Sequence, residues 1–464
     1  MAELISKSAC EIVALLKTGE ISIDDTLDAL EAQIEKIDPE INALPTLCFE
    51  RARAAARQGD RIDSVLSGIP VAIKDLTDVA GVRTTYGSML HVNHIPEQSD
   101  ILVERIEANG GIIYAKSNTP EFGTGGNTFN DVFGATRNPH DVSRSAGGSS
   151  GGAAAALASG SAWLAQGSDL GGSLRTPAAF CGVTSLRPSP GLITTSPGTQ
   201  PFDVYSQKGP MARSVADLAL FADAMAGPSS LTGFSKSHLI DEFRNAAARP
   251  LKPLKIAYSE DLGITQTSSE VAEICNAAIA KLAREQINIE TNHPDLSMMD
   301  AAFEVPRALD YVQSFGADLA STRGIMKPEV VWNIEKGLNL GAEEIRQSLD
   351  AQGQVFANAS QFMQDYDLLI CPATIIPAYP VEERYPGYSD GLEYSEYYRW
   401  LKICCAITTT TLPVITLPCG KTDSGLPIGL QLIGKAHGEL ELFALASYLE
   451  QVFDWNPLQA ISCS

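Results

Sequence analysis

The segment from residue 120 to residue 200 constrains the fold more than any other part of the sequence. It is rich in Gly, Ser, Asn and Pro, and it carries few charges over its whole length. A structureless loop of that length is uncommon in a compact domain. Small residues also allow backbone to approach other backbone or a ligand closely. We therefore expect this segment to be ordered and buried.

Strand and helix patterns alternate on both sides of this segment. Short apolar runs that are typical of buried strands occur at residues 69–73, 112–115, 367–372 and 412–417. Amphipathic patterns predict helices at residues 1–18, 22–37, 49–58, 215–225, 271–285 and 440–453. This alternation predicts the α/β class, and neither a repeat nor a clear linker divides the chain.

Charge and hydropathy exclude several classes of protein. The net charge is −22 and no basic run occurs, which argues against a nucleic-acid partner. The two long uncharged stretches, 145–168 and 403–420, are not runs of about 20 strongly apolar residues, so we expect no membrane span. The start of the chain lacks a signal-peptide pattern. The nine cysteines include no CxxC, which favours reduced thiols and a cytoplasmic location.

Residues 147–152 read Gly-Gly-Ser-Ser-Gly-Gly and place Ser149 and Ser150 among glycines. A helix-forming stretch follows at residues 153–158. Such a segment can present serine hydroxyls and bare N–H groups at a helix N-terminus, where anions are favoured. The alternative interpretation is a flexible Ser/Gly loop.

Residues 167–175 read Gly-Ser-Asp-Leu-Gly-Gly-Ser-Leu-Arg, so that Gly171 and Gly172 directly precede Ser173. Two glycines before a serine let successive backbone N–H groups converge on one point, which is what an oxyanion hole needs. The alternative is a tight turn with a capping serine.

Lys74 ends the apolar run of residues 71–73 and is followed by Asp75. A lysine at the end of a buried strand is costly unless it is paired. When partly desolvated, its amine can lose a proton near neutral pH and act as a base. The alternative is a side chain that extends to the surface.

The nucleophile elbow of α/β-hydrolases fits the sequence poorly. Residues 147–151 match its G-x-S-x-G pattern formally, but residues 138–144 before them do not read as a buried strand. The elbow also needs a downstream histidine. The histidines available, none in a distinctive setting, are His238, His293 and His437.

Metal and nucleotide motifs also fit poorly. His91 and His94 form the only close histidine pair, and no second cluster joins them. There is no Walker loop, and the glycines at residues 123–126 lack the Rossmann spacing. We therefore expect neither a metal nor a cofactor.

Taken together, these segments resemble the amidase signature family. The similarity includes Gly-Ile-Pro-Val-Ala-Ile-Lys-Asp at residues 68–75 and Lys-Ser-Asn-Thr-Pro-Glu-Phe-Gly at residues 116–123. It continues through residues 136–139, 147–152, 167–187, 209–215 and 425–434. It spans nearly the whole chain, apart from a weak stretch at about residues 226–366.

The resemblance implies one amidase domain over residues 1–464, with an α/β fold around a large mixed, mostly parallel sheet that helices cover on both sides. Within this domain we expect N-terminal helices at 1–60, a catalytic core at 61–225, a variable helical region at 226–366, and the C-terminal part of the core at 367–464.

The resemblance also implies a Ser–cis-Ser–Lys triad and amide hydrolysis. Ser173 would be the nucleophile, Ser149 the bridging serine with a cis peptide bond, and Lys74 the base. The implied oxyanion donors are the N–H groups of Leu170, Gly171, Gly172 and Ser173. The implied supporting residues are Ser150, Ser168, Asp169 and Arg175.

The sequence says less about the substrate. We expect an apolar pocket, for which the aromatic candidates are Phe122, Phe129, Phe133, Tyr397 and Trp400, with core packing as the alternative role of each. The backbone expected to face the acyl group is that of Thr124, Gly125, Gly126 and Asn127. Such a pocket would suit small amides and anilides, with carbamates or esters as further substrates. We expect a monomer or a homodimer.

Two other roles stay open. One branch of the family is the subunit that hydrolyses glutamine in a tRNA-dependent amidotransferase. Its members have an acidic Tyr-Leu-x-Asp-type pattern before the late Leu-Pro segment. Residues 396–409 of this chain do not have that pattern and are more similar to stand-alone amidases. The chain could also be an inactive member used for binding, although Lys74, Ser149 and Ser173 are all present.

Overall fold

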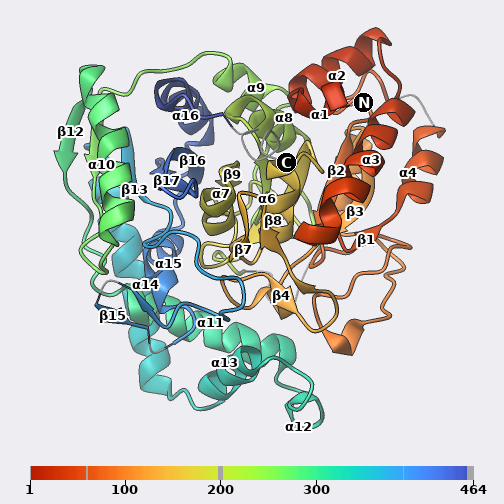
Figure 1. Cartoon of the computed structure of the whole chain (residues 1–464). Helices are drawn as coiled ribbons and strands as arrows, with labels where there is room; N and C mark the ends of the chain where they lie inside the picture. Colours follow the sequence, from red (N-terminus) through yellow and green to blue (C-terminus); the bar gives the residue numbers. More distant parts are fainter. Residues whose placement is uncertain (1, 59–60, 197–201, 390, 395, 457–464) are drawn as a thin grey trace.

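The computed structural model describes residues 2–58, 61–196, 202–389, 391–394 and 396–456. Its centre is an 11-stranded sheet (Figure 1). The strands lie in the order β1 (Thr46–Leu47), β3 (Ile112–Ser117), β2 (Pro70–Lys74), β8 (Leu164–Asp169), β10 (Gln207–Ala212), β9 (Thr184–Arg187), β16 (Val414–Lys421), β17 (Pro427–Ile433), β13 (Leu368–Pro372), β11 (Lys255–Tyr258) and β12 (Asn288–Thr291).

The sheet is mixed, which confirms the expected α/β class. Parallel pairing occurs in two outer blocks, β3–β2–β8 and β13–β11–β12. The strands between these blocks pair antiparallel, as does the short edge strand β1. Consecutive strands β16 and β17 are joined by a tight turn at Gly425, whose φ is 88°, and a hairpin connection requires antiparallel strands. Among the described strands, parallel pairing thus occurs only within these two outer blocks of the sheet.

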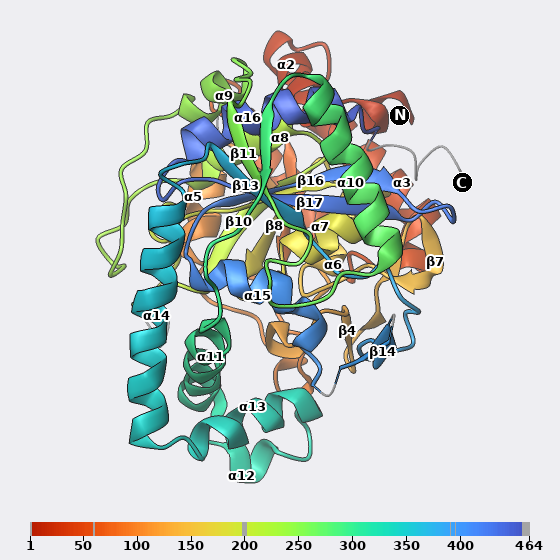
Figure 2. The ribbon, with the colours of Figure 1, turned by 90° about the vertical axis from the view of Figure 1, so that its left-hand side faces the viewer.

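Helices cover both faces of the sheet. In Figure 2, α8 and α16 lie on one side of the central strands, and α6 and α7 lie on the other. The helices around the sheet are α3 (Ile23–Ile41), α4 (Phe49–Ala56), α5 (Ile101–Ala108), α6 (Gly151–Ala158), α7 (Arg175–Cys181), α8 (Val215–Met225), α9 (Glu242–Ala247), α10 (Ser269–Arg284) and α16 (Glu439–Phe453). Every residue of α6 and α7 is buried, in line with the expectation for residues 120–200, of which 197–200 lie outside the described residues.

The N-terminal segment differs from the single helix that its periodicity predicts. It forms α1 (Ala2–Ser6) and α2 (Ala9–Thr18). The break falls at Ser8, because its side chain accepts a hydrogen bond from the Glu11 N–H and the Glu11 carboxylate accepts one from the Ser8 N–H. This capping box starts a new helix. Gly19 ends α2 in the left-handed conformation.

A second group of helices lies at one end of the molecule, where the similarity to the family is weak (Figures 1 and 2). It consists of α11 (Met299–Phe315), α12 (Leu319–Thr322), α13 (Pro328–Leu338) and α14 (Ala342–Phe362). Helix α11 packs against α13, α14 and α15 (Lys402–Thr409), which follows the short helix η3 (Arg399–Leu401). This contact brings α11 toward the sheet.

Short hairpins complete the described structure: β4 (Phe129–Asn130) with β5 (Gly134–Ala135), β6 (Arg137–Asn138) with β7 (Asp141–Ser145), and β14 (Tyr388–Ser389) with β15 (Leu392–Glu393). Strand β7 is buried only at Ser145, so it is not the buried strand that a nucleophile elbow requires.

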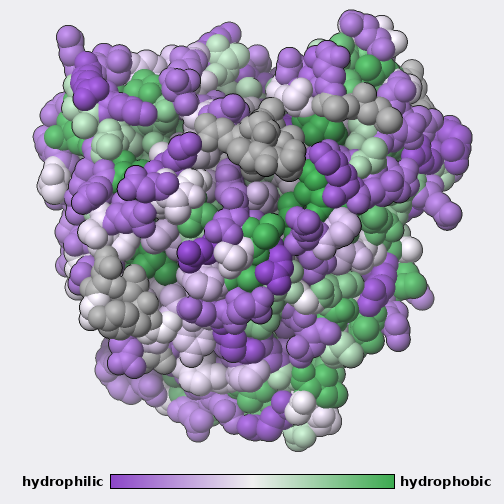
Figure 3. Space-filling model, in the orientation of Figure 1, coloured by the Kyte–Doolittle hydropathy of each residue, from purple (hydrophilic) through white to green (hydrophobic). Residues whose placement is uncertain are grey.

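The surface and the thiols agree with the composition. Hydrophilic side chains cover most of the face shown in Figure 3, with apolar side chains in small groups. None of the described helices is long and apolar enough to cross a bilayer. The eight described cysteines are free thiols, and six of them are buried; Cys463 lies outside the described residues.

Candidate active site

Three sequence motifs meet at one edge of the sheet. Strands β2 and β8 are neighbours and run parallel, so their carboxyl ends lie side by side. Lys74 is the last residue of β2, and Ser168 and Asp169 end β8. The Gly-Ser segment with Ser149 directly precedes α6, which packs on these strands.

Lys74 is fully buried and contacts three serine hydroxyls. Its Nζ lies 2.7 Å from the Oγ of Ser149, 2.9 Å from that of Ser150 and 3.0 Å from that of Ser168. No carboxylate among the described residues forms an ion pair with this amine. The long side chain is therefore held by hydroxyl groups rather than by a counter-ion.

The environment of Lys74 favours its neutral form. Burial lowers the pKa of the amine well below its usual value, and the nearby positive charge of Lys208 acts in the same direction. The Asp169 carboxylate has the opposite effect, but it is a smaller one. A desolvated amine beside a hydroxyl can accept that hydroxyl's proton.

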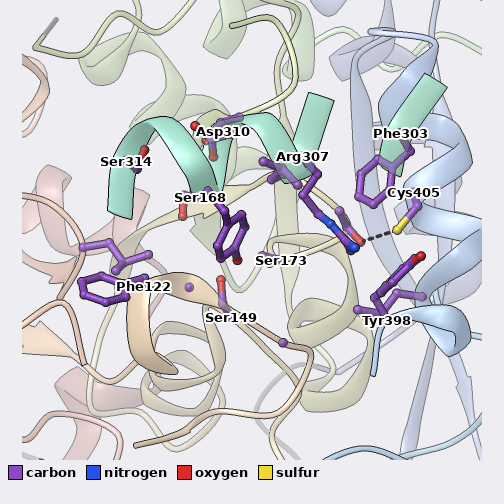
Figure 4. Close-up of a pocket in the computed structure, with 18 of the residues that line it drawn as sticks. Phe122, Ser149, Ser168, Ser173, Phe303, Arg307, Asp310, Ser314, Tyr398 and Cys405 are labelled. Carbon is purple, nitrogen blue, oxygen red and sulfur yellow. Dashed lines mark hydrogen bonds between the residues drawn. The ribbon is translucent and has the colours of Figure 1, made fainter. Parts of the chain in front are cut away.

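Ser149 and Ser173 line the same cavity (Figure 4). The peptide bond between Gly148 and Ser149 is cis, the geometry that the family resemblance implied. The N–H of Ser150 donates a hydrogen bond to the carbonyl of Ser173 over 3.1 Å. This bond ties the two glycine-rich segments together next to the cavity.

The Asp169 carboxylate organises the turn that carries Ser173. It accepts hydrogen bonds from the N–H groups of Gly172 (2.9 Å) and Leu174 (3.0 Å). The predicted oxyanion loop needs one correction for this reason, because the Gly172 N–H points to Asp169 and not into the cavity. Leu170, Gly171 and Ser173 line the cavity.

Arg175 is the main partner of Asp169. Its Nε and Nη2 lie 3.0 and 2.8 Å from the two carboxylate oxygens, a bidentate ion pair with both side chains fully buried. Burial alone would raise the pKa of Asp169, but Arg175 and Arg187 hold it below its usual value. Arg187 also donates to the Asp169 carbonyl over 2.6 Å. Sequence reasoning missed Arg187, although it lies within the similar segment 167–187.

Arg175 also anchors the C-terminal part of the chain. Its Nη1 donates to the carbonyl of Cys404 (2.8 Å) and to Oε1 of Gln431 (2.7 Å), and its Nη2 donates to Oγ1 of Thr408 (2.8 Å). The nucleophile turn is therefore braced between β17 and α15. These partners lie more than 200 residues away in the sequence, so no local pattern could have indicated them.

The opposite wall of the cavity comes from α11 and from residues 397–405. Figure 4 shows Phe303, Arg307, Asp310 and Ser314 on α11, across the cavity from Ser149. Lys208 lines the cavity from β10, where it pairs in register with Ser168. Sequence reasoning missed Arg307, Asp310 and Lys208. The available signal was the spacing of Arg307, four residues from both Phe303 and Tyr311 on one helical face.

The predicted substrate residues divide into two sets. Phe122, Gly125 and Tyr397 line the cavity. Thr124 lies beside it, with its hydroxyl 2.7 Å from that of Tyr311. Of the other aromatic candidates, Phe129 lines a separate cavity with Lys327, and Phe133 stacks under Arg83.

The structure contradicts the predicted pocket-lining role of Gly126, Asn127 and Trp400. Trp400 is fully buried and stacks on Phe180, and a side chain at Gly126 would collide with its indole ring. The Asn127 amide donates to the carbonyls of Val381 (3.0 Å) and Glu383 (2.8 Å). These residues hold loops together and do not line the cavity.

The histidine pair His91 and His94 takes part in ring packing. His91 and His94 pack against each other and against Tyr86. Within the described ranges, no group of three or more potential ligands is arranged to hold a metal ion.

The family model for amidases matches residues 25–443. The chain is 31% identical to an acylamidase of Rhodococcus erythropolis, over 97% of this chain and 96% of that protein. It is also 31% identical to the A subunit of a glutamyl-tRNA(Gln) amidotransferase from Moorella thermoacetica, over 98% of both chains. The crystal structure of a bacterial aryl acylamidase of the amidase signature family superposes with a TM-score of 0.91 at 25% identity, covering 98% of this chain and 99% of that one.

The chain therefore belongs to the amidase family. It is a hydrolase that acts on the carbon–nitrogen bonds of amides.

Proposed function

We propose that this protein hydrolyses small organic amides with Ser173 as nucleophile, Ser149 as proton carrier and Lys74 as base. The observation that carries the proposal is the 2.7 Å contact between the buried Lys74 amine and the Ser149 hydroxyl, beside the cavity that Ser149 and Ser173 share. The described structure contains no direct hydrogen bond between the two serine hydroxyls, so their relay rests on this shared cavity.

The proposed reaction has two halves. Neutral Lys74 takes a proton from Ser149, Ser149 takes one from Ser173, and the Ser173 oxygen attacks the carbonyl carbon. The proton returns through Ser149 to the leaving nitrogen, because an amine anion is a poor leaving group. The C–N bond then breaks and leaves an acyl-enzyme at Ser173. Water releases the acid by the same relay.

The negative oxygen of the tetrahedral intermediate needs hydrogen-bond donors. We assign this role to the backbone N–H groups of Leu170, Gly171 and Ser173, because these three residues line the cavity. Gly172 supports them indirectly, since its N–H bond to Asp169 fixes the turn. The ion pair between Asp169 and Arg175 holds that turn in place.

The substrate range follows from the chemistry and from the relatives. An acylamidase and an aryl acylamidase are among the proteins that this chain is similar to, so we propose anilides and alkyl amides as substrates. A carbamate or an ester presents the same carbonyl to Ser173 and is a further candidate. In this proposal the chain acts without a protein partner or a nucleic acid.

The variant Ser173→Ala tests the proposal. It removes one oxygen from a partly exposed position, so we expect an unchanged melting temperature and a loss of amide turnover of at least about 10³-fold. A fluorophosphonate probe should label the parent protein and not the variant. Turnover close to that of the parent would refute the assignment of Ser173.

A second candidate function is glutamine hydrolysis as the A subunit of a tRNA-dependent amidotransferase. The observation in its favour is the similarity to several such subunits, at up to 31% identity over nearly the whole chain. Assays of the purified chain alone separate the two functions. Turnover of anilides without glutaminase activity supports the stand-alone amidase, whereas turnover of glutamine only in the presence of partner subunits supports the second function.

A further inference from the structure

Arg307 occupies an unusual position in the cavity wall. It projects from α11 toward the space between Ser173 and the pair Cys405 and Tyr398 (Figure 4). Only 4% of the residue is exposed, and its Nε and Nη2 have no hydrogen-bond partner. No ion pair with Arg307 is found in the part of the chain that the structure describes.

Aromatic rings surround the guanidinium instead of carboxylates. Its central carbon lies 3.7 Å from the ring centroid of Tyr398, 5.3 Å from that of Phe303 and 5.6 Å from that of Tyr397. Cation–π contacts of this kind orient the group and offset part of its desolvation. They leave Nε and Nη2 without a hydrogen bond.

Arg399 contacts the same Tyr398 ring but, unlike Arg307, forms ion pairs. Its guanidinium lies 5.3 Å from the centroid of Tyr398, and its side chain is partly exposed to solvent. It forms ion pairs with Asp300 (3.1 Å), Glu304 (2.9 Å) and Glu396 (2.6 Å). It does not line the cavity. Carboxylates are therefore abundant near Tyr398, yet the arginine inside the cavity has none.

The other charged groups of the cavity do not compensate Arg307. Lys208 adds a second basic group on the opposite wall, and burial lowers the pKa of its amine. Asp310 is the one carboxyl group among the described lining residues, and burial, with a smaller effect of Asp203, raises its pKa to about 6. The cavity thus contains an excess of cationic groups in a chain whose net charge is −22.

An unpaired buried charge is costly unless a ligand pairs with it. An arginine is delocalised and always protonated, so an anionic oxygen at its cavity-facing edge stabilises the whole group. We propose that Arg307 binds a carboxylate on the substrate, and that the preferred substrates are small amides that carry a carboxylate beside the scissile bond. This inference rests on the proposed amidase function and names a substrate class within it.

Matched substrates test the inference. For the acyl side, the para-nitroanilide of succinate is compared with that of butyrate, which replaces the carboxylate by a methyl group. For the amine side, acetylated para-aminobenzoate is compared with acetylated para-toluidine. Dissociation constants are measured calorimetrically in the Ser173→Ala background, so that binding is read without turnover. Values of kcat/KM are measured in the parent background.

Three variants complete the design. Arg307→Met removes the charge and keeps much of the side-chain volume, Arg307→Lys keeps the charge without the planar fork, and Arg399→Met is the matched control at the same ring. With Arg307 present, we expect the carboxylate member of at least one pair to bind about tenfold tighter or more. Arg307→Met should abolish that preference, Arg307→Lys should keep part of it, and Arg399→Met should leave it within about twofold.

The outcomes separate the inference from the proposed function. Equal binding of both members in both pairs overturns the role of Arg307, whatever the turnover. The role is also overturned if Arg307→Met keeps the preference. A carboxylate preference in binding that disappears in Arg307→Met supports the inference even if the parent protein turns over none of the four compounds, a result that would count against the amidase proposal instead.

Discussion

The catalytic wall of the cavity, which carries Ser149 and Ser173, and the helical wall, which α11 forms, differ in the pairing of one arginine at each. Behind the catalytic wall, Arg175 is fully buried and uses five hydrogen bonds, two of them to the Asp169 carboxylate. On the helical wall, Arg307 is almost as deeply buried but is surrounded by rings and has two unpartnered nitrogens. Both residues carry the same charge into the same region of the protein.

This difference separates two uses of a buried charge. A charge whose hydrogen bonds are all made within the chain fixes geometry, as Arg175 does for the turn that carries Ser173. A charge that the fold leaves unpaired beside a cavity is available to a ligand. The catalytic wall is therefore organised before substrate arrives, whereas the helical wall is completed by substrate. Substitutions in the two walls should accordingly have different effects.

The largest effect is expected from Lys74→Met, which removes the base from the catalytic wall. The methionine fills most of the same space, so the fold should persist. We expect kcat/KM for amides to fall by about 10³-fold or more, because general-base catalysis and proton return are both lost. Near-UV circular dichroism serves as the control for folding. A loss of less than tenfold would show that Ser149 is activated by another group.

The pH dependence of the parent enzyme tests whether neutral Lys74 is the base. The pKa of Lys74 is lowered by burial, and only the neutral amine can accept a proton. Activity should therefore be lost as pH falls through this pKa and should rise to a plateau above it. The midpoint of the rise in activity should lie well below pH 10.5, the ordinary pKa of a lysine amine. A profile of kcat/KM that rises toward acid would contradict a neutral-lysine base.

Stability distinguishes the two arginines directly. Arg175→Met leaves the Asp169 carboxylate buried without its main partner, and we expect a loss of about 3–5 kcal/mol in the free energy of unfolding. Arg307→Met loses cation–π contacts but also removes unpaired polar atoms, so we expect a change of less than about 2 kcal/mol. Denaturant unfolding of both variants measures the difference. Equal losses would mean that Arg307 is mainly structural.

The smallest expected effect is that of a chelator. The proposed relay uses only the amine of Lys74 and the hydroxyls of Ser149 and Ser173. Dialysis against EDTA should therefore change kcat/KM for a neutral anilide by less than about 20%, within the error of such assays. Loss of activity that Zn²⁺ or Mn²⁺ restores would require a different catalytic group.

Sequence reasoning was most accurate about which residues come together where the motifs have short, fixed spacings. Lys74, the pair Ser149 and Ser150, and the turn at Ser173 lie within the segments that carry the family resemblance, and the structure brings all of them to one edge of the sheet. It was less accurate for residues 122–127 and Trp400. Glycine and aromatic residues suit a pocket wall and a packed core equally well, so their composition could not decide between the two.

The sequence by itself indicated the class of fold and, through its resemblance to the amidase signature family, the residues that we assign to the relay, because motifs of fixed spacing can be recognised without coordinates. Only the tertiary structure decided what faces them. Arg307 lies on a helix 134 residues beyond Ser173 in the chain, and its meaning depends on which side chains surround it. Absence of a partner cannot be read from a sequence, since it is a property of the whole packed neighbourhood.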